Sequence, residues 1–73
     1  MSISFSEHAV LQIKKRKISE KLVIEVAENP QEVIDSYRGR KLRRARLDDK
    51  LLEVVTVTED SRITVITAYY LEE

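Results

Sequence analysis

Two stretches near the start of the chain have apolar residues at the three- and four-residue spacing of amphipathic helices. Each stretch begins with a serine, Ser6 or Ser19, whose hydroxyl suits an N-cap. We predict one helix from Ser6 to about Arg16 and a second from Ser19 to Asn29, where Pro30 stops it. The apolar positions are Ala9, Val10 and Ile13 in the first helix, and Leu22, Val23, Val26 and Ala27 in the second.

After Pro30 the apolar period changes to two, which is typical of strands. Short groups of turn residues around Gly39, at Asp48-Asp49 and at Glu59-Asp60-Ser61 divide this region. Helices followed by strands predict an α+β fold, with the two N-terminal helices packed on one face of a four-stranded antiparallel meander sheet and a single domain over residues 1–73. The predicted strands are Gln31 to Tyr37, Arg40 to Leu47, Lys50 to Thr58 and Arg62 to Leu71.

The last predicted strand is apolar on both faces. Strict alternation places Ile63, Val65, Thr67, Tyr69 and Leu71 on one face, and Thr64, Ile66, Ala68 and Tyr70 on the other. A sheet covered on one side only is usually more polar on its second face. The second face is therefore a concave binding surface or a partner interface. The alternative is that the strand is central in the sheet and buried on both faces.

Composition bounds the chemistry. The chain has 73 residues, no Cys and a single His, so a disulfide framework or a thiolate metal site is impossible. One Gly excludes the usual glycine-rich phosphate loops. We expect no cofactor and no metal. The N-terminal sequence lacks a basic segment followed by an apolar run, and we expect a cytoplasmic protein without a membrane segment.

Charge is unevenly distributed, although 13 Lys+Arg balance 13 Asp+Glu. The segment RGRKLRRAR is a predicted strand whose local field would attract phosphates or an acidic partner. Arginine's planar fork favours bidentate phosphate contacts, and the alternative is that these residues protect a sheet edge from aggregation. We predict nucleic-acid binding by Arg16 at the end of the first helix and by Arg38, Arg40, Lys41, Arg43, Arg44 and Arg46.

The helix-end cations have a simpler explanation as well. Lys14, Lys15, Arg16 and Lys17 lie where the helix macrodipole favours positive charge. They would join the basic strand in one patch only if the helix ends beside it.

Candidate catalytic residues come from the requirements of metal-free RNA cleavage. A base removes the 2′-hydroxyl proton, an acid protonates the leaving oxygen, and cations stabilise the transition state. His8 has the only side chain with an unperturbed pKa near neutrality, and Tyr69, Arg40 and Arg44 would supply the other roles. A surface position for His8 and ordinary packing for the tyrosines remain the alternatives.

Four segments, FSEHAVLQIKKRKIS, ENPQEVID, RGRK and DSRITVITAYYL, together resemble a family of small bacterial and archaeal domains of unknown function (DUF) related to the BrnT and RelE/ParE toxins. The matching positions are His8, Arg16, Gly39-Arg40, Val65-Ile66-Thr67 and Tyr69. Lys17 departs from the glycine usual after Arg16, which makes a left-handed turn there more costly. The resemblance implies a BrnT/RelE-like fold and a ribonuclease toxin, with or without ribosome dependence, that a cognate antitoxin holds inactive.

Three classes of function remain open. In the leading hypothesis the domain binds RNA, free or on the ribosome, and cleaves it to a 2′,3′-cyclic phosphate without metal. In the second, the domain is a non-catalytic interaction module whose arginine strand binds an acidic partner. In the third, it forms a homodimer through the second face of its sheet.

Overall fold

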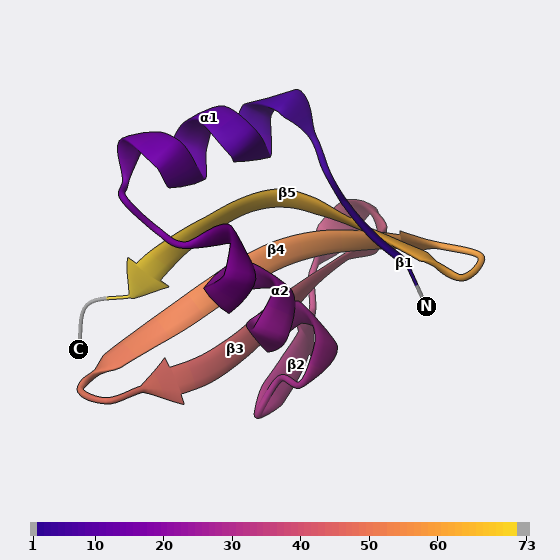
Figure 1. The fold of residues 1–73 in the computed structure, drawn as a ribbon. Helices are drawn as coiled ribbons and strands as arrows, with labels where there is room; N and C mark the ends of the chain where they lie inside the picture. Colours follow the sequence, from indigo (N-terminus) through magenta and orange to yellow (C-terminus); the bar gives the residue numbers. More distant parts are fainter. Residues whose placement is uncertain (1, 72–73) are drawn as a thin grey trace.

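Two helices lie along one face of a five-stranded sheet in the computed structural model (Figure 1). The structure describes residues 2–71, so residues 1, 72 and 73 of the expected domain lie outside the described residues. No helix among those described is long and apolar enough to cross a membrane. The elements are β1 (Ser2–Phe5), α1 (Glu7–Lys15), α2 (Glu20–Glu28), β2 (Glu32–Asp35), η1 (Tyr37–Gly39), β3 (Arg40–Leu47), β4 (Lys50–Glu59) and β5 (Arg62–Leu71).

Both helices begin where their serine caps predict. The Ser6 hydroxyl accepts a hydrogen bond from the Ala9 N–H at 3.0 Å, and the Ser19 hydroxyl accepts from the Leu22 N–H at 3.4 Å. The predicted ends at Arg16 and Asn29 are confirmed as the C-cap residues of α1 and α2. Local sequence therefore sets the bounds of both helices.

The sheet differs from the predicted antiparallel meander. β1 adds a fifth strand that pairs parallel with β5, from Ser2 opposite Arg62 to Phe5 opposite Val65, so the sheet is mixed with the order β1-β5-β4-β3-β2. The four-stranded prediction was wrong because a four-residue segment with alternating serines gives a weak strand signal. A parallel partner some 60 residues away also leaves no turn between the two strands for the sequence to display.

The first predicted strand is shorter than expected. β2 covers Glu32–Asp35, and the chain then forms η1 rather than extending to Tyr37. Arg38 and Gly39 both have positive φ, at 63° and 72°, and the Arg40 N–H donates to the Tyr37 carbonyl. Positive φ at both central residues is the requirement of a type I′ hairpin turn, which matches the twist of the strands it joins. The bounds predicted for β3 and β5 are confirmed, and β4 extends one residue further than predicted.

A β-bulge in β5 changes which side chains share a face. Val55 pairs with Thr67 and Thr56 with Val65, which leaves Ile66 as an extra residue. The helix-facing set is therefore Ile63, Val65 and Ala68, all at most 1% exposed, whereas Thr67 and Tyr69 turn to the opposite face. The predicted strict alternation was wrong beyond Ile66, because hydrophobicity patterns do not report a bulge within an apolar run.

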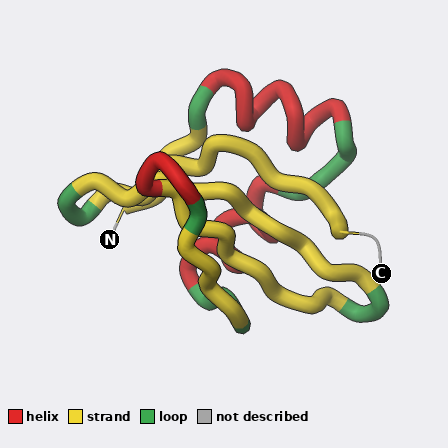
Figure 2. The backbone as a smooth tube through the Cα atoms, turned by 180° about the vertical axis from the view of Figure 1, so that it is seen from behind, coloured by secondary structure: helices red, strands yellow, loops and turns green. Residues whose placement is uncertain are grey.

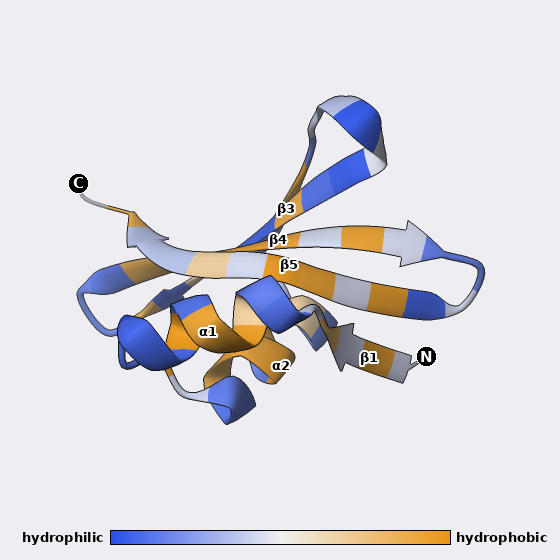
Figure 3. Ribbon diagram, turned by 90° about the horizontal axis from the view of Figure 1, so that it is seen from above, coloured by the Kyte–Doolittle hydropathy of each residue, from blue (hydrophilic) through white to orange (hydrophobic). Residues whose placement is uncertain are grey.

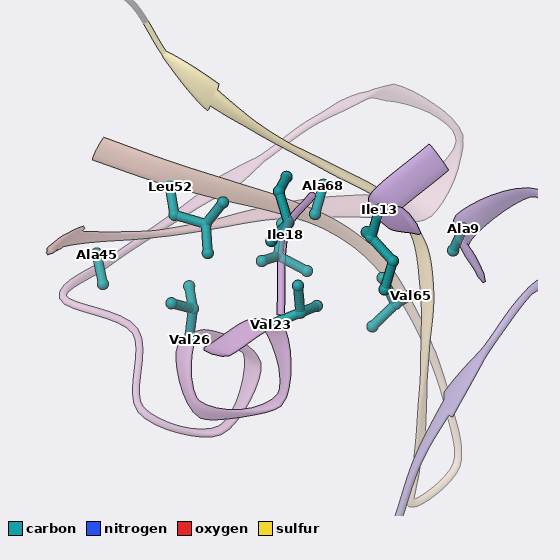
Figure 4. Close-up of a cluster of buried hydrophobic side chains, with 10 residues drawn as sticks. Ala9, Ile13, Ile18, Val23, Val26, Ala45, Leu52, Val65 and Ala68 are labelled. Carbon is teal, nitrogen blue, oxygen red and sulfur yellow. The ribbon is translucent and has the colours of Figure 1, made fainter. Parts of the chain in front are cut away.

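The core fills the space between the helices and the sheet (Figure 4). Residues from both helices meet small and branched side chains of β3, β4 and β5 there. Figure 3 shows the apolar faces of α1 and α2 turned toward the sheet. The buried cluster consists of Ala9, Ile13, Ile18, Val23, Val26, Ala45, Leu52, Val54, Val65 and Ala68.

The corner between the helices keeps its left-handed residue despite the absence of glycine. Lys17 has φ of 57°, the Ile18 N–H donates to the Ile13 carbonyl at 2.8 Å, and the Lys17 N–H donates to the Lys14 carbonyl at 3.2 Å. These two bonds form a Schellman motif, in which glycine usually occupies the left-handed position. The Lys17 side chain therefore carries a steric cost of about 1 kcal/mol.

Replacing Lys17 with glycine tests that cost. We expect Lys17→Gly to raise the free energy of unfolding by about 1 kcal/mol, measured by urea denaturation, because the left-handed conformation is unstrained in glycine. The matched control is Lys14→Gly, within α1, which should lower it by about the same amount. Destabilisation by both variants would contradict this account of the corner.

Candidate functional site

The sheet face opposite the helices, which we term the open face, carries one side of the basic strand. Arg44 pairs with Glu53, which in turn pairs with Tyr69, so these residues form a row across β3, β4 and β5. Arg40, Leu42 and Arg46 share the face of Arg44 by alternation along β3. Lys41 and Arg43 point to the helix side. Alternation along β3 therefore divides its basic residues between the two faces of the sheet.

Glu53 holds this row together. Its carboxylate accepts one hydrogen bond from the Arg44 Nε at 2.5 Å and another from the Tyr69 hydroxyl. The Arg44 Nη1 also lies 3.6 Å from the Glu32 carboxylate of β2. We term Glu32, Arg44, Glu53 and Tyr69 the Glu53 cluster; it spans four adjacent strands.

Burial explains why Glu53 needs two donors. The residue is 3% exposed, and an unpaired carboxylate at such a position would cost several kcal/mol. The hydrogen bond to Glu53 raises the pKa of Arg44 above its ordinary value. Burial, together with the hydrogen bond to the Glu53 carboxylate, raises the pKa of Tyr69 to about 12. Tyr69 is therefore a neutral hydrogen-bond donor at physiological pH.

Arg16 brings α1 into contact with the open face. Its Nη1 donates to the Ala68 carbonyl at 3.0 Å and to the Thr67 hydroxyl at 3.2 Å. The guanidinium carbon lies 5.9 Å from the centroid of the Tyr69 ring, within the range of a cation–π contact. Arg16 thus contacts the Glu53 cluster from a separate element. Because α1 ends beside β5, and β4 separates β5 from β3, Arg16 does not lie beside the basic strand as a merged basic patch would require.

Other predicted nucleic-acid contacts have roles inside the fold. Lys41 forms an ion pair with Asp35 at 2.9 Å. Arg43 donates to the Thr56 hydroxyl at 3.2 Å and to the Ala27 carbonyl at 3.0 Å, so it caps the C-terminal end of α2 from the helix side of the sheet.

The remaining cations of the basic strand surround the hairpin turn and the far end of β3. Within residues 2–71, Arg38 and Arg40 form no ion pair, and the backbone N–H of the exposed Arg46 donates to the Gln31 side chain at 2.9 Å. Within this range no carboxylate pairs with Arg38, Arg40 or Arg43, and the Arg43 guanidinium already donates to Thr56 and Ala27.

The structure does not bring His8 to the Glu53 cluster. His8 is exposed, and no hydrogen bond or ion pair to another described residue involves its side chain. It precedes Arg16 by eight residues on the same stripe of α1, which corresponds to about 12 Å along a helix axis. The predicted catalytic set of His8, Arg40, Arg44 and Tyr69 therefore divides, with only Arg44 and Tyr69 in one cluster.

Sequence analysis did not single out Glu53, the residue at the centre of the cluster. Its signal was nevertheless present, because Glu53 is the only charged residue within LLEVVTV. A lone carboxylate in an apolar strand predicts a buried partner. Within the part of the chain that the structure describes, no three metal-ligating side chains gather.

The chemistry of the cluster follows from these contacts. It offers a neutral phenol as donor, a carboxylate as acceptor and an aromatic ring beside a cation. Only some of the Arg16 donors are occupied by the contacts described, so the guanidinium can also face an anion at the edge of β5.

The raised pKa of Tyr69 makes the stability of the protein sensitive to alkali. The folded state holds the phenolic proton of Tyr69 more tightly than the unfolded state does. The contribution of Tyr69 to the free energy of unfolding is therefore fully present below pH 10 and is lost as the pH rises toward 12. We expect this fall to be shallower in Tyr69→Phe, measured as the free energy of unfolding against pH. In the wild type, tyrosinate absorbance should show a component with a midpoint near 12 that Tyr69→Phe lacks. If Tyr69→Phe still showed the component near 12, the assignment to Tyr69 would be contradicted.

Comparison with known proteins places the chain in a family. Neither the curated proteins nor the solved structures gave a match. One family model matches residues 5–70, and its description is "Domain of unknown function (DUF4258)". The match extends from the last residue of β1 to the next-to-last residue of β5, and so includes Arg16, Glu53 and Tyr69. The chain belongs to the DUF4258 family of domains of unknown function.

Proposed function

We propose that the open face binds RNA and that the domain acts as a toxin-like ribonuclease of BrnT/RelE-like fold. The observation that carries the proposal is the position of Tyr69. Its ring lies beside Arg16, and its hydroxyl donates to the same Glu53 carboxylate as Arg44. An aromatic ring beside a guanidinium group is a combination that binds a nucleotide, by stacking on the base and pairing with the phosphate.

The amount of charge available sets the expected strength of binding. Lys41 and Arg44 already face carboxylates, so Arg16, Arg38 and Arg40 are the cations to which we assign phosphate contacts. About three contacts give a logarithmic salt slope near −2 on a single strand, at about −0.7 per phosphate. The proposed affinity is therefore moderate and strongly dependent on salt.

The proposed reaction is transesterification without metal. A base takes the ribose 2′-hydroxyl proton, the 2′-oxygen attacks phosphorus, and the bond to the 5′-oxygen breaks to leave a 2′,3′-cyclic phosphate. Tyr69, neutral at physiological pH, would protonate the leaving 5′-oxygen, and Arg16 would stabilise the charged phosphorane. The 2′-hydroxyl proton would pass to water, because His8 lies about two turns of α1 from Arg16 and does not reach a phosphodiester held at Tyr69.

Salt dependence of binding tests the assignment of the cations. We expect the wild type to bind a fluorescent oligoribonucleotide with a slope near −2, and Arg16→Gln and Arg40→Gln each to reduce the slope by about 0.7. Lys21→Gln, a charge removed from the exposed side of α2, is the matched control and should leave the slope unchanged. Equal slopes for all four proteins would rule out the open face as the RNA site.

Cleavage is tested separately, with end-labelled RNA incubated in EDTA to exclude contaminating metal-dependent nucleases. We expect wild-type protein to produce fragments ending in a cyclic phosphate, and Tyr69→Phe to slow this by about a hundredfold or more, the usual contribution of a general acid. His8→Ala, about two turns of α1 from Arg16, should leave the rate unchanged. Arg44→Ala is unsuitable because it would leave the buried Glu53 without its cation. RNA binding without cleavage, with and without ribosomes, would remove the catalytic part of the proposal and keep the binding part.

A second candidate function follows from the internal pairing of the basic strand. Because the fold uses Lys41, Arg43 and Arg44 for its own contacts, few cations remain for a ligand, and these also suit an interaction module that binds an acidic protein segment. That function predicts salt-sensitive binding of an acidic peptide and no binding of RNA. A homodimer through the open face would instead appear in sedimentation as a concentration-dependent mass.

A further inference from the structure

We propose that the turn between β2 and β3 is a second nucleotide-binding site, which stacks an unpaired base on Tyr37 and so selects single-stranded RNA. We term Tyr37, Arg38, Gly39 and Arg40 the hairpin tip. The inference rests on the proposed RNA-binding function of the open face and adds to it a substrate class and a site distinct from the Glu53 cluster.

Tyr37 has the exposure of a contact residue rather than of a packing residue. It is 77% exposed, whereas Tyr70 is 36% exposed and Tyr69 belongs to the Glu53 cluster. A ring that buries so little area adds little to the stability of the fold. It does leave a flat aromatic surface accessible, and such a surface stacks with any base that is not already stacked on its neighbours.

The backbone of the hairpin tip is strained at a position where another amino acid would be less strained. Arg38 occupies the first central position of the turn with φ of 63°, where asparagine before glycine is the favoured pair. Strain of this kind is retained where the surrounding structure needs a particular side chain. Here the side chain is that of an arginine, which follows Tyr37 in the sequence at the end of the hairpin.

The hairpin tip also stands over the proposed RNA surface. η1 lies in front of the strands when the molecule is seen from behind (Figure 2), and it rises from the sheet on the side opposite α1 and α2 (Figure 3). Arg40 pairs with Val57 at the base of this projection, so its side chain lies on the open face. RNA on that face would therefore meet the aromatic ring and the two cations of the hairpin tip together.

These features favour single strands over duplexes. In an RNA duplex the base faces are covered by stacking, and the phosphates alone remain accessible to Arg38 and Arg40. In a single strand the phosphates pair with the same arginines while one base turns onto Tyr37. The ring contact thus adds affinity only for unpaired RNA.

The test measures fluorescence anisotropy of a labelled oligoribonucleotide, alone and annealed to its complement. We expect Tyr37→Ala to weaken binding of the single strand by about tenfold and to leave binding of the duplex unchanged, because stacking on an aromatic side chain is lost. Tyr37→Phe keeps the ring and should bind like the wild type. Leu11→Ala, which removes an apolar side chain 68% exposed on α1, is the control for loss of exposed surface.

A second variant separates binding from folding. Arg38→Asn creates the favoured Asn-Gly pair, so it should raise the urea midpoint while weakening binding of the single strand. A wild type that binds no RNA overturns both the proposed function and this inference. A wild type that binds single-stranded RNA with the same affinity as Tyr37→Ala, or that binds the duplex equally well, overturns the hairpin tip alone.

Discussion

The Glu53 carboxylate is the constraint on which the open face depends. A charge 3% exposed in the middle of a sheet must be neutralised by hydrogen bonds from its neighbours, and the adjacent strands provide Arg44 and Tyr69. Glu32 then balances the other side of Arg44, which extends the pairing to the edge strand. The polar contacts of this row require one register across four strands, because a slip of one residue would turn Arg44 or Tyr69 away from the carboxylate.

Charge in this chain is therefore divided between two uses. A segment with six basic residues suggests a broad anion-binding strand, yet Lys41, Arg43 and Arg44 satisfy groups of the protein itself. Cations used in this way stabilise the fold and contribute little to a long-range field. Arg38 and Arg40 of the same segment, together with Arg16 at the end of α1, have no carboxylate partner among residues 2–71, which explains how a chain of zero formal net charge can present a local site.

Much of the fold could be predicted from local signals, and the site could not. Ser6, Ser19 and Pro30 act on their immediate neighbours, so the helix limits and the change to strands were accessible from sequence. β1 was missed because its only partner is distant in the chain, and Glu53 because a carboxylate's importance depends on the strands beside it. His8 is the opposite case: its chemistry suggests catalysis, whereas helix geometry places it about two turns from Arg16 and outside the Glu53 cluster.

One inserted residue connects these local and distant features. If β5 alternated without interruption, Tyr69 would share the helix-facing side of Ile63 and Val65 and could not reach Glu53. The extra residue at Ile66 turns Tyr69 to the open face and brings Ala68 into the core. The Ser6 hydroxyl, which caps α1, also donates to the Ile66 carbonyl at 3.4 Å, so the bulge is attached to the start of the helix that carries Arg16 at its end. The bulge thus positions Tyr69 on the open face and connects β5 to the helix that carries Arg16. Bulges beside functional sites in other sheets also redirect side chains in this way.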